Sequence, residues 1–166
     1  MNRRFVLGSA LSVAAVAVAG LGVTTLTAQE SSPAVATAST SDAVPANRKM
    51  TIWRDPGCGC CDAYADYMEE NGYVVTRIDD RDFDKRSIEV GVPEAGLGCH
   101  LAQVDGYYVS GLVPAEIVDR LTTERPEIIG ITLPGMPQNA PGMGGKNGPL
   151  KTFAFGKDGV SVYADE

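Results

Sequence analysis

The sequence predicts an α/β domain in which a central mixed sheet is flanked by helices. Three observations support this fold class. Short β-prone runs alternate with helical patterns, an Asp-Gly turn joins two strands near the middle of the chain, and a cysteine cluster separates the first strand from the first helix. The chain has 166 residues, which suffices for one such domain with appendages.

The first half of the domain is predicted to run strand, helix, strand and short helix. The β-prone run "MTIWR" ends at a Pro-Gly turn, and a helical stripe then begins at Cys61 and stops at Asn71-Gly72. The second β-prone run is "YVVTRI", and a weak helical pattern after it closes at "GVP". The predicted elements are strands at 50–54 and 73–78, a helix from 61, and a short helix at 83–90.

The second half is predicted to contain two hairpins, separated by a helix and a loop. Asp105-Gly106 is the strongest short hairpin signal in the chain, and Pro114 suits the first turn of a helix. In order, the predicted elements are strands at 101–104 and 107–109, a helix between Pro114 and Pro126, a Gly/Pro/Met/Asn-rich loop at 130–149, and a hairpin that turns at Asp158-Gly159.

The order strand, helix, strand, helix, strand, strand, helix is that of the thioredoxin fold. In that fold, helices cover a central sheet and the chemistry lies at the N-terminus of a helix. The cysteine cluster of this chain lies between the first predicted strand and the first predicted helix. We therefore predict a thioredoxin-like domain over residues 48–166, with a C-terminal Met/Gly/Pro loop and β-hairpin.

The N-terminal segment has the features of an export signal. Arg3-Arg4 precedes an uncharged apolar run at 5–26, and small residues around Thr27-Ala28 suit cleavage. The paired arginines favour the twin-arginine route over general secretion. An uncleaved membrane anchor is the alternative, although glycine, serine and threonine make the run a poor span. Residues 1–28 are thus predicted to be the signal, and the Ser/Ala/Thr/Pro-rich residues 29–47 a disordered linker.

The charge balance argues against two classes of partner. Removal of residues 1–28 takes away two arginines and no acidic residue, which leaves 12 basic against 21 acidic side chains and a net charge of −9. An acidic surface disfavours nucleic acid and anionic membranes, and it tolerates cations. We expect neither of the first two as partners once the signal is removed.

The stretch "DPGCGCCD" holds three of the four cysteines, namely Cys58, Cys60 and Cys61. At the start of a helix, unpaired backbone N–H groups and the helix dipole stabilise thiolates, which favours both redox exchange and metal binding. A structural disulfide is the alternative in an exported protein. However, a bridge between Cys58 and Cys61 closes a very short loop, which restricts the unfolded chain little, and it leaves the third thiol unexplained.

A second group of candidate ligands is Cys99-His100, which contains the only histidine of the chain. It precedes the first strand of the Asp-Gly hairpin, and in a thioredoxin-like layout the loop entering that strand faces the cysteine loop. A lone histidine is more often structural. Its position beside Cys99 favours a ligand or acid/base role for His100.

The third group of candidate ligands is a pair of methionines in "LPGMPQNAPGMGG". Met136 and Met143 each follow Pro-Gly in a loop with almost no other bulky residue, where there is little core for them to fill. Thiolate, thioether and imidazole together favour Cu(I), whereas zinc has little use for a thioether. A loop that only packs on the domain is the alternative.

These motifs together resemble the CopG-like family of exported, thioredoxin-like metal-binding proteins associated with copper resistance. The motifs are "CGCC", "GCH", "DGYYVSGLVPAEIVDRL" and "LPGMPQNAPGM", in that order, and the resemblance covers roughly residues 49–164. It implies a copper centre, with several Cu ions, and an oxidoreductase role on copper. The family pattern has Gly-His-Val-Pro where this chain has Leu112, which cannot coordinate a metal. The implied ligands are Cys58, Cys60, Cys61, Cys99, His100, Met136 and Met143.

Two functions follow from this reasoning. As a periplasmic binding protein, the domain would sequester Cu(I) or hand it on to other periplasmic copper-handling proteins. As an enzyme, it would use copper, or Cys58 and Cys61 as a catalytic dithiol. The crowding of Cys60, Cys99 and the methionines around this pair, and the missing imidazole, favour binding over turnover.

Overall fold

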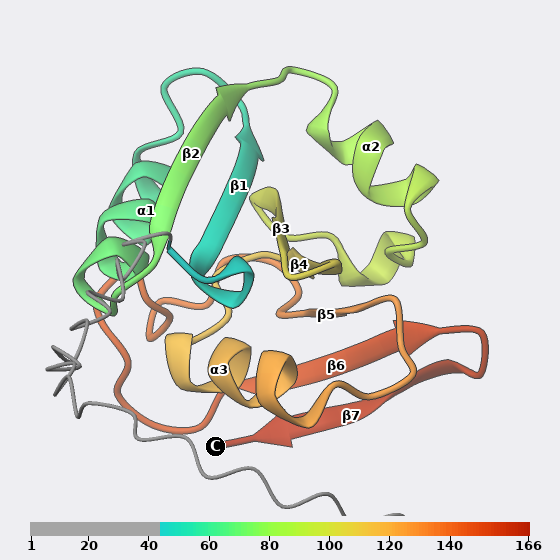
Figure 1. Ribbon diagram of the computed structural model, residues 1–166. Helices are drawn as coiled ribbons and strands as arrows, with labels where there is room; N and C mark the ends of the chain where they lie inside the picture. The colour runs from blue at the N-terminus through green and yellow to red at the C-terminus, as the bar shows by residue number, and fades with distance from the viewer. Residues whose placement is uncertain (1–43) are drawn as a thin grey trace, which may run out of the picture. The chain divides into compact units, whose positions relative to one another are not determined.

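A seven-stranded mixed sheet organises the described part of the molecule. The computed structural model describes residues 44–166, and the strand order across the sheet is β2-β1-β3-β4-β5-β6-β7 (Figure 1). The predicted export signal, and the predicted linker up to residue 43, lie outside the described residues. The strands are Lys49–Arg54 (β1), Val74–Asp79 (β2), His100–Val104 (β3), Tyr107–Ser110 (β4), Gly130–Thr132 (β5), Lys151–Gly156 (β6) and Gly159–Asp165 (β7).

The described residues also form three α-helices and two short 3-10 helices. The α-helices are Gly59–Glu70 (α1), Phe83–Glu89 (α2) and Ala115–Glu124 (α3), and the 3-10 helices are Ala46–Arg48 (η1) and Glu94–Gly96 (η2). Over residues 44–166, no helix is both long enough and apolar enough to cross a membrane.

Strands β1 to β4 have the thioredoxin-like arrangement that the sequence predicts. β1 pairs in parallel with β2 and antiparallel with β3, and β3 pairs antiparallel with β4. Asp105 and Gly106 join β3 to β4 with φ angles of 47° and 87°. A type I′ hairpin requires positive φ at both turn residues, which explains the Asp-Gly sequence. The predicted fold class is confirmed.

Helices α1 and α3 pack on one face of the sheet, and the segment around α2 packs on the other. The larger apolar cluster joins Tyr64 of α1 and Leu121 of α3 to Ile52 of β1. The smaller cluster contains Leu101 of β3 and Val92, which follows α2. Side chains alternate between the faces of a strand, so neighbouring residues enter different clusters. This arrangement leaves the C-terminal end of β1 and the start of α1 together at one edge of the core.

The predicted loop at 130–149 contains a strand, so that prediction is wrong at its start. Gly130–Thr132 forms β5, which pairs in parallel with β4 and antiparallel with β6. A Cβ added to Gly130 would lie 2.1 Å from the carbonyl oxygen of Tyr108, so the close approach of the two strands requires glycine. A three-residue strand that starts with glycine has too little pattern to be seen in the sequence.

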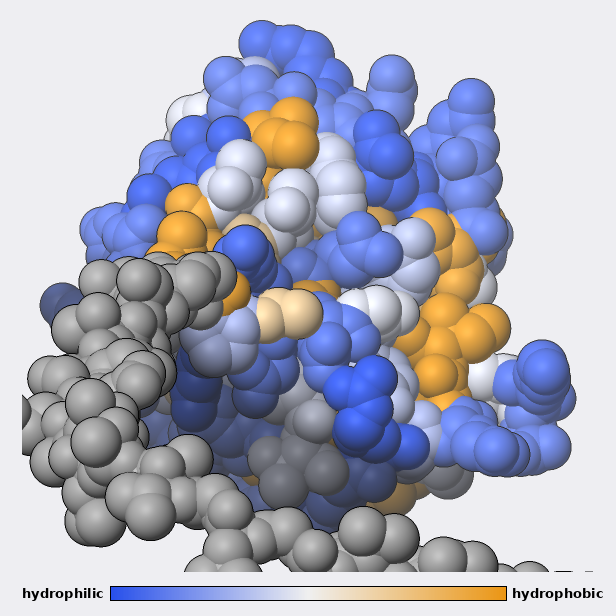
Figure 2. All heavy atoms as spheres, in the orientation of Figure 1, coloured by the Kyte–Doolittle hydropathy of each residue, from blue (hydrophilic) through white to orange (hydrophobic). Residues whose placement is uncertain are grey.

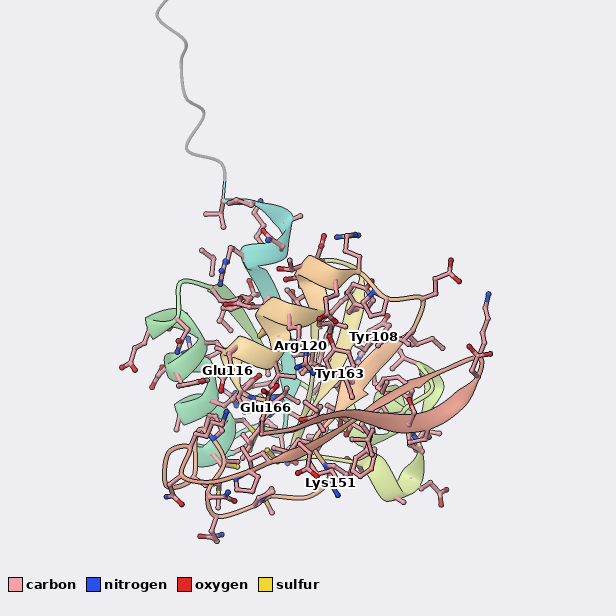
Figure 3. The ribbon with its side chains drawn as sticks, turned by 90° about the horizontal axis from the view of Figure 1, so that it is seen from below. Tyr108, Glu116, Arg120, Lys151, Tyr163 and Glu166 are labelled. Atoms are coloured by element: carbon pink, nitrogen blue, oxygen red, sulfur yellow. A yellow bond between two sulfur atoms is a disulfide. The ribbon has the colours of Figure 1, made fainter. Side chains whose placement is uncertain are left out.

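The predicted C-terminal hairpin is confirmed, but its turn consists of Lys157 and Asp158, one residue earlier than predicted, and Gly159 begins β7. The hairpin is attached to α3 (Figure 3). Arg120 on α3 donates hydrogen bonds to the backbone carbonyl of Tyr163 at 2.8 Å and to the Glu166 carboxylate at 2.7 Å. Its guanidinium also lies 4.6 Å from the centre of the Tyr163 ring. These contacts hold the β6–β7 extension against the helix.

One face of the described residues is mainly hydrophilic. Figure 2 shows a face of the described residues on which hydrophilic side chains dominate and hydrophobic ones lie in small separate patches.

Candidate metal centre

The loop between β1 and α1 presents the first cysteines through a tight turn. The amide of Cys58 donates a hydrogen bond to the carbonyl of Asp55 at 3.1 Å, and Gly57 between them has a φ of 81°. Proline followed by a residue with positive φ is the signature of a type II turn, so glycine is needed at position 57. Helix α1 begins directly afterwards at Gly59, two residues earlier than predicted. Cys60 and Cys61 therefore lie in its first turn.

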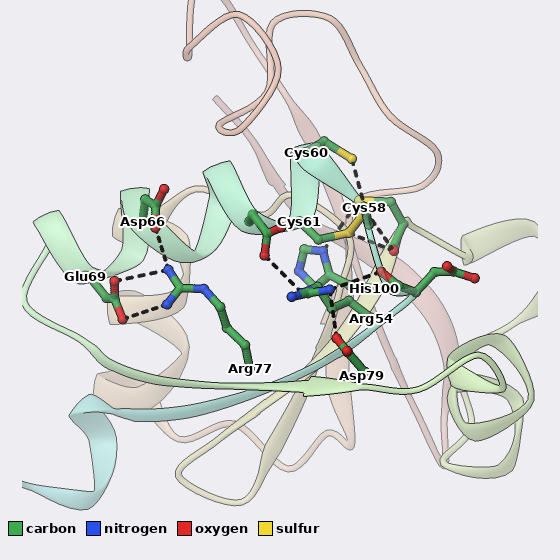
Figure 4. A network of polar contacts seen from close by, with 12 residues as sticks. Arg54, Cys58, Cys60, Cys61, Asp66, Glu69, Arg77, Asp79 and His100 are labelled. Carbon is green, nitrogen blue, oxygen red and sulfur yellow. Dashed lines mark hydrogen bonds and ion pairs between the residues drawn. A yellow bond between two sulfur atoms is a disulfide. The ribbon is translucent and has the colours of Figure 1, made fainter.

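Four cysteine sulfurs meet at this helix end, and Figure 4 shows Cys58, Cys60 and Cys61 there. The Sγ atoms of Cys58, Cys60, Cys61 and Cys99 all lie within 4.8 Å of one another. Two sulfurs bound to one ion at about 2.3 Å each are at most about 4.6 Å apart. The spacing therefore suits a shared metal ion after small side-chain adjustments.

Cys58 and Cys61 are joined in a disulfide, whereas Cys60 and Cys99 are free thiols. The Cys60 Sγ lies 3.5 Å from the Cys58 Sγ, so the Cys60 thiol can donate to it. The Cys61 Sγ lies 3.2 Å from the carbonyl oxygen of Cys99. In the disulfide this is only a contact, because the sulfur carries no proton. After reduction the Cys61 thiol is placed to donate to that oxygen.

His100 is the first residue of β3 and directly follows Cys99 in the chain. Its side chain is fully buried, and its ring packs against the Tyr64 ring at a tilt of 34°, with 4.7 Å between the ring centroids. Its Nδ1 lies 3.5 Å from the Cys99 Sγ. Its Nε2 has no hydrogen-bond partner among residues 44–166. His100 is therefore a neighbour of one thiol and lies outside the group of four sulfurs.

Burial keeps both Cys99 and His100 neutral. Burial, together with a smaller contribution from the nearby Cys60, raises the pKa of the Cys99 thiol to about 12. Burial lowers the pKa of His100 to about 3. At neutral pH the metal-free pair is thus a thiol and an uncharged imidazole, and the thiol can donate to Nδ1.

The methionine loop lies against both cysteine-bearing segments. The Gly135 amide donates to the Leu97 carbonyl at 2.9 Å, just before Cys99. A Cβ added to Gly142 would lie 2.6 Å from the carbonyl oxygen of Cys60, so the loop touches the start of α1.

The two predicted methionine ligands have different positions. The Sδ of Met136 lies 4.0 Å from the Cys60 Sγ, and its side chain is 54% exposed. Met143 is 36% exposed and makes no such sulfur contact within the described residues. Of the two thioethers, Met136 is thus the one whose sulfur contacts a cysteine sulfur at 4.0 Å among the described residues.

Leu112 belongs to the hydrophobic core. Its side chain is fully buried in the larger apolar cluster. At the position where the family pattern has histidine, this chain therefore gains packing and has no metal ligand.

Arg54 is a supporting residue that sequence reasoning missed. It ends β1, and its side chain is 14% exposed. Its guanidinium lies 3.0 Å from the Asp62 carboxylate in the first turn of α1. It also lies 2.9 Å from the Asp79 carboxylate at the end of β2 (Figure 4). The Nε group is close to Asp62 but poorly aligned for a hydrogen bond, so this contact is mainly electrostatic. Arg54 thus ties the cysteine-bearing turn to the sheet.

The backbone next to Cys99 leaves no room for a side chain. A Cβ added to Gly98 would lie 2.2 Å from the Gly111 Cα. We expect Gly98→Ala to lower the free energy of unfolding by about 1–3 kcal/mol, as overpacking of a core does. Urea denaturation measures this loss. Gly59→Ala is the control, because its Cβ would meet open space. Equal stability of the Gly98 variant and the native protein would contradict the expectation.

The fold and the site together define a thioredoxin-like protein with a cysteine cluster able to bind a metal. Two solved structures agree with this class, described as "Copper resistance protein copG- Form 2" and "Copper resistance protein copG- Form 1". Each is 33% identical to this chain, covers 71% of it and has a TM-score of 0.65, with 97% and 96% of the respective relatives covered. The chain therefore belongs to the CopG-like family. Residues 97–143 match the family model described as "Protein of unknown function, DUF411", and no curated protein matches the chain.

Proposed function

We propose that the protein binds Cu(I) at the cysteine cluster and sequesters it or hands it on in copper homeostasis or resistance. The observation that carries this proposal is the grouping of four cysteine sulfurs within 4.8 Å, with the Met136 thioether 4.0 Å from Cys60. Thiolate and thioether are soft ligands that select Cu(I), whereas zinc sites seldom use a thioether. Five sulfurs in one place also suit more than one copper ion.

The proposed setting is the periplasm. The paired arginines and the apolar run at the N-terminus favour export, and the two related solved structures are described as copper resistance proteins. The proposed partners are copper ions and other periplasmic copper-handling proteins. The acidic composition, with 21 Asp and Glu against 14 Lys and Arg, favours a cation over nucleic acid.

An anaerobic metal titration of the fully reduced protein tests the proposal. We expect the protein to retain Cu(I) in the presence of a chromophoric Cu(I) chelator. We also expect it to lose Zn(II) readily to a zinc chelator that binds Zn(II) as tightly as the first chelator binds Cu(I). Each thiol that becomes a thiolate ligand releases a proton, so Cu(I) binding should acidify a weakly buffered solution. Zinc held as tightly as copper would contradict the assignment of the metal.

A second candidate function is thiol–disulfide exchange, which the Cys58–Cys61 disulfide favours. Cys58 is partly accessible and Cys61 is fully buried, at the N-terminus of a helix where thiolates are stabilised. If exchange is the main function, the Cys60→Ser variant should reduce a disulfide substrate at the native rate, because only Cys58 and Cys61 take part. If copper binding is the main function, Cys60→Ser should impair copper binding.

A further inference from the structure

The disulfide divides the sulfur cluster into two pairs. Cys58 and Cys61 share a covalent bond, and Cys60 and Cys99 keep free thiols. The thiolate is the form of cysteine that binds metals, and a disulfide sulfur carries no such charge. The disulfide form therefore offers two cysteine ligands where the reduced form offers four.

The two free thiols remain close enough to share an ion. Their Sγ atoms belong to the group that lies within 4.8 Å, near the limit of about 4.6 Å for two sulfurs on one ion. The Met136 Sδ adds a third soft donor 4.0 Å from the Cys60 Sγ.

The residues of this smaller set are also only partly buried. Cys60 and Cys99 are both partly exposed, and Met136 is 54% exposed. By contrast, Cys61 is fully buried. The residues that the disulfide leaves free thus lie nearer the surface than Cys61 does.

We propose that the disulfide form keeps a smaller Cu(I) site made of Cys60, Cys99 and Met136, so that oxidation of Cys58 and Cys61 lowers the copper capacity without abolishing it. This inference rests on the proposed Cu(I)-binding function. It assigns the Cys58–Cys61 pair a regulatory role, in which the redox state of the pair sets how much copper the protein holds.

The switch between the two forms is a thiol–disulfide exchange with an external dithiol. One thiolate of that dithiol attacks the accessible Cys58 sulfur, the Cys58–Cys61 bond breaks, and Cys61 leaves as a thiolate that takes up a proton. The second thiol of the dithiol then attacks the mixed disulfide and releases Cys58. Two electrons and two protons thus pass to Cys58 and Cys61, and the external dithiol becomes a disulfide.

The experiment compares the copper capacity of the two redox forms of the full chain. The protein is prepared fully reduced, with four titratable thiols, and as the disulfide form, with two, and the disulfide is mapped by peptide mass spectrometry. Excess reductant is removed, and each form is titrated anaerobically with Cu(I). Native mass spectrometry counts the bound ions, and a chromophoric chelator measures their affinity. We expect the disulfide form to bind at least one Cu(I), and the reduced form to bind more.

Two double variants separate the two pairs of cysteines. Cys58→Ser with Cys61→Ser cannot form the disulfide, and we expect it to hold as much copper as the native disulfide form whether or not reductant is present. Cys60→Ser with Cys99→Ser should bind no Cu(I) in the disulfide form and should regain binding on reduction. Because the double change could impair folding, the single variant Cys60→Ser, in which Cys60 is only half-buried, repeats the test on the disulfide form.

The possible failures are distinguishable. If the reduced native protein binds no Cu(I), the proposed function fails, and the inference fails with it. If the reduced form binds copper and the disulfide form binds none, only the inference is overturned. If the two forms hold equal copper, the pair does not set the capacity, and the inference is again overturned.

Discussion

Replacement of Cys60 by serine is expected to weaken Cu(I) binding by the reduced protein at least about 100-fold, because loss of a direct ligand should exceed the 10–100-fold losses seen for residues that only support a ligand. Cys60 contacts both another cysteine sulfur and the thioether of Met136. Its Sγ lies 3.5 Å from the Cys58 Sγ and 4.0 Å from the Met136 Sδ. Competition with a chromophoric chelator under anaerobic conditions measures the change.

The fold should survive this substitution. Cys60 is only half-buried and forms no disulfide, so serine leaves the covalent structure intact. Cys61→Ser is the contrasting variant, since it removes the disulfide and places a hydroxyl at a fully buried position. Loss of so short a loop closure costs about 2 kcal/mol in the chain-entropy account, so Cys61→Ser should melt lower than Cys60→Ser under oxidising conditions. Native copper affinity in Cys60→Ser would place the metal away from this cluster.

Much of the fold follows from local signals in the sequence. Asp105-Gly106 needs positive φ at both residues, and that requirement is visible in the residue types themselves. Strand β5 is different, since its three residues are positioned by pairing with β4 and β6. Gly130 is a packing requirement against the Tyr108 carbonyl, which is distant in sequence. A residue chosen for a non-local contact has no local pattern by which to find it.

The meeting of the cysteines could be predicted from topology, but their chemical states could not. Once the strand order is known, the loop before β3 must face the start of α1, which brings Cys99 to the other three. The division into one disulfide and two thiols depends on side-chain positions, and no spacing rule states it. The full burial of His100 against Tyr64 likewise depends on packing. The sequence did indicate that His100 lies near the cysteine cluster, because it is a histidine next to Cys99.

The role of Arg54 shows a further limit of sequence reasoning. An arginine at the end of a strand is common in sequences and indicates no special role. The role of Arg54 comes from its ion pairs with Asp62 and Asp79, which lie on two other elements. The only sequence signal was its position directly before the cysteine loop. These ion pairs can be recognised only when the relative positions of β1, α1 and β2 are known.

The methionine loop gives the second large expected effect, and its two methionines should differ. Met136→Leu is expected to weaken Cu(I) binding by the reduced protein about tenfold, roughly 1.4 kcal/mol of binding free energy. The substitution keeps size and apolarity and removes the sulfur atom, which lies 4.0 Å from the Cys60 Sγ. Met143→Leu is expected to have a smaller effect, because its side chain does not share that sulfur contact within residues 44–166.

Stability measurements separate coordination from packing. Met136 is 54% exposed, so its replacement by leucine should leave the melting temperature of the metal-free protein nearly unchanged. Met68→Leu is the matched control: Met68 is fully buried on α1, and the same chemical change there should affect stability and not copper binding. Chelator competition and thermal melts of the three variants test both halves of the expectation. If Met136→Leu binds copper as the native protein does, the Met136 thioether is not a ligand. If Met143→Leu also binds copper as the native protein does, the loop only packs on the domain.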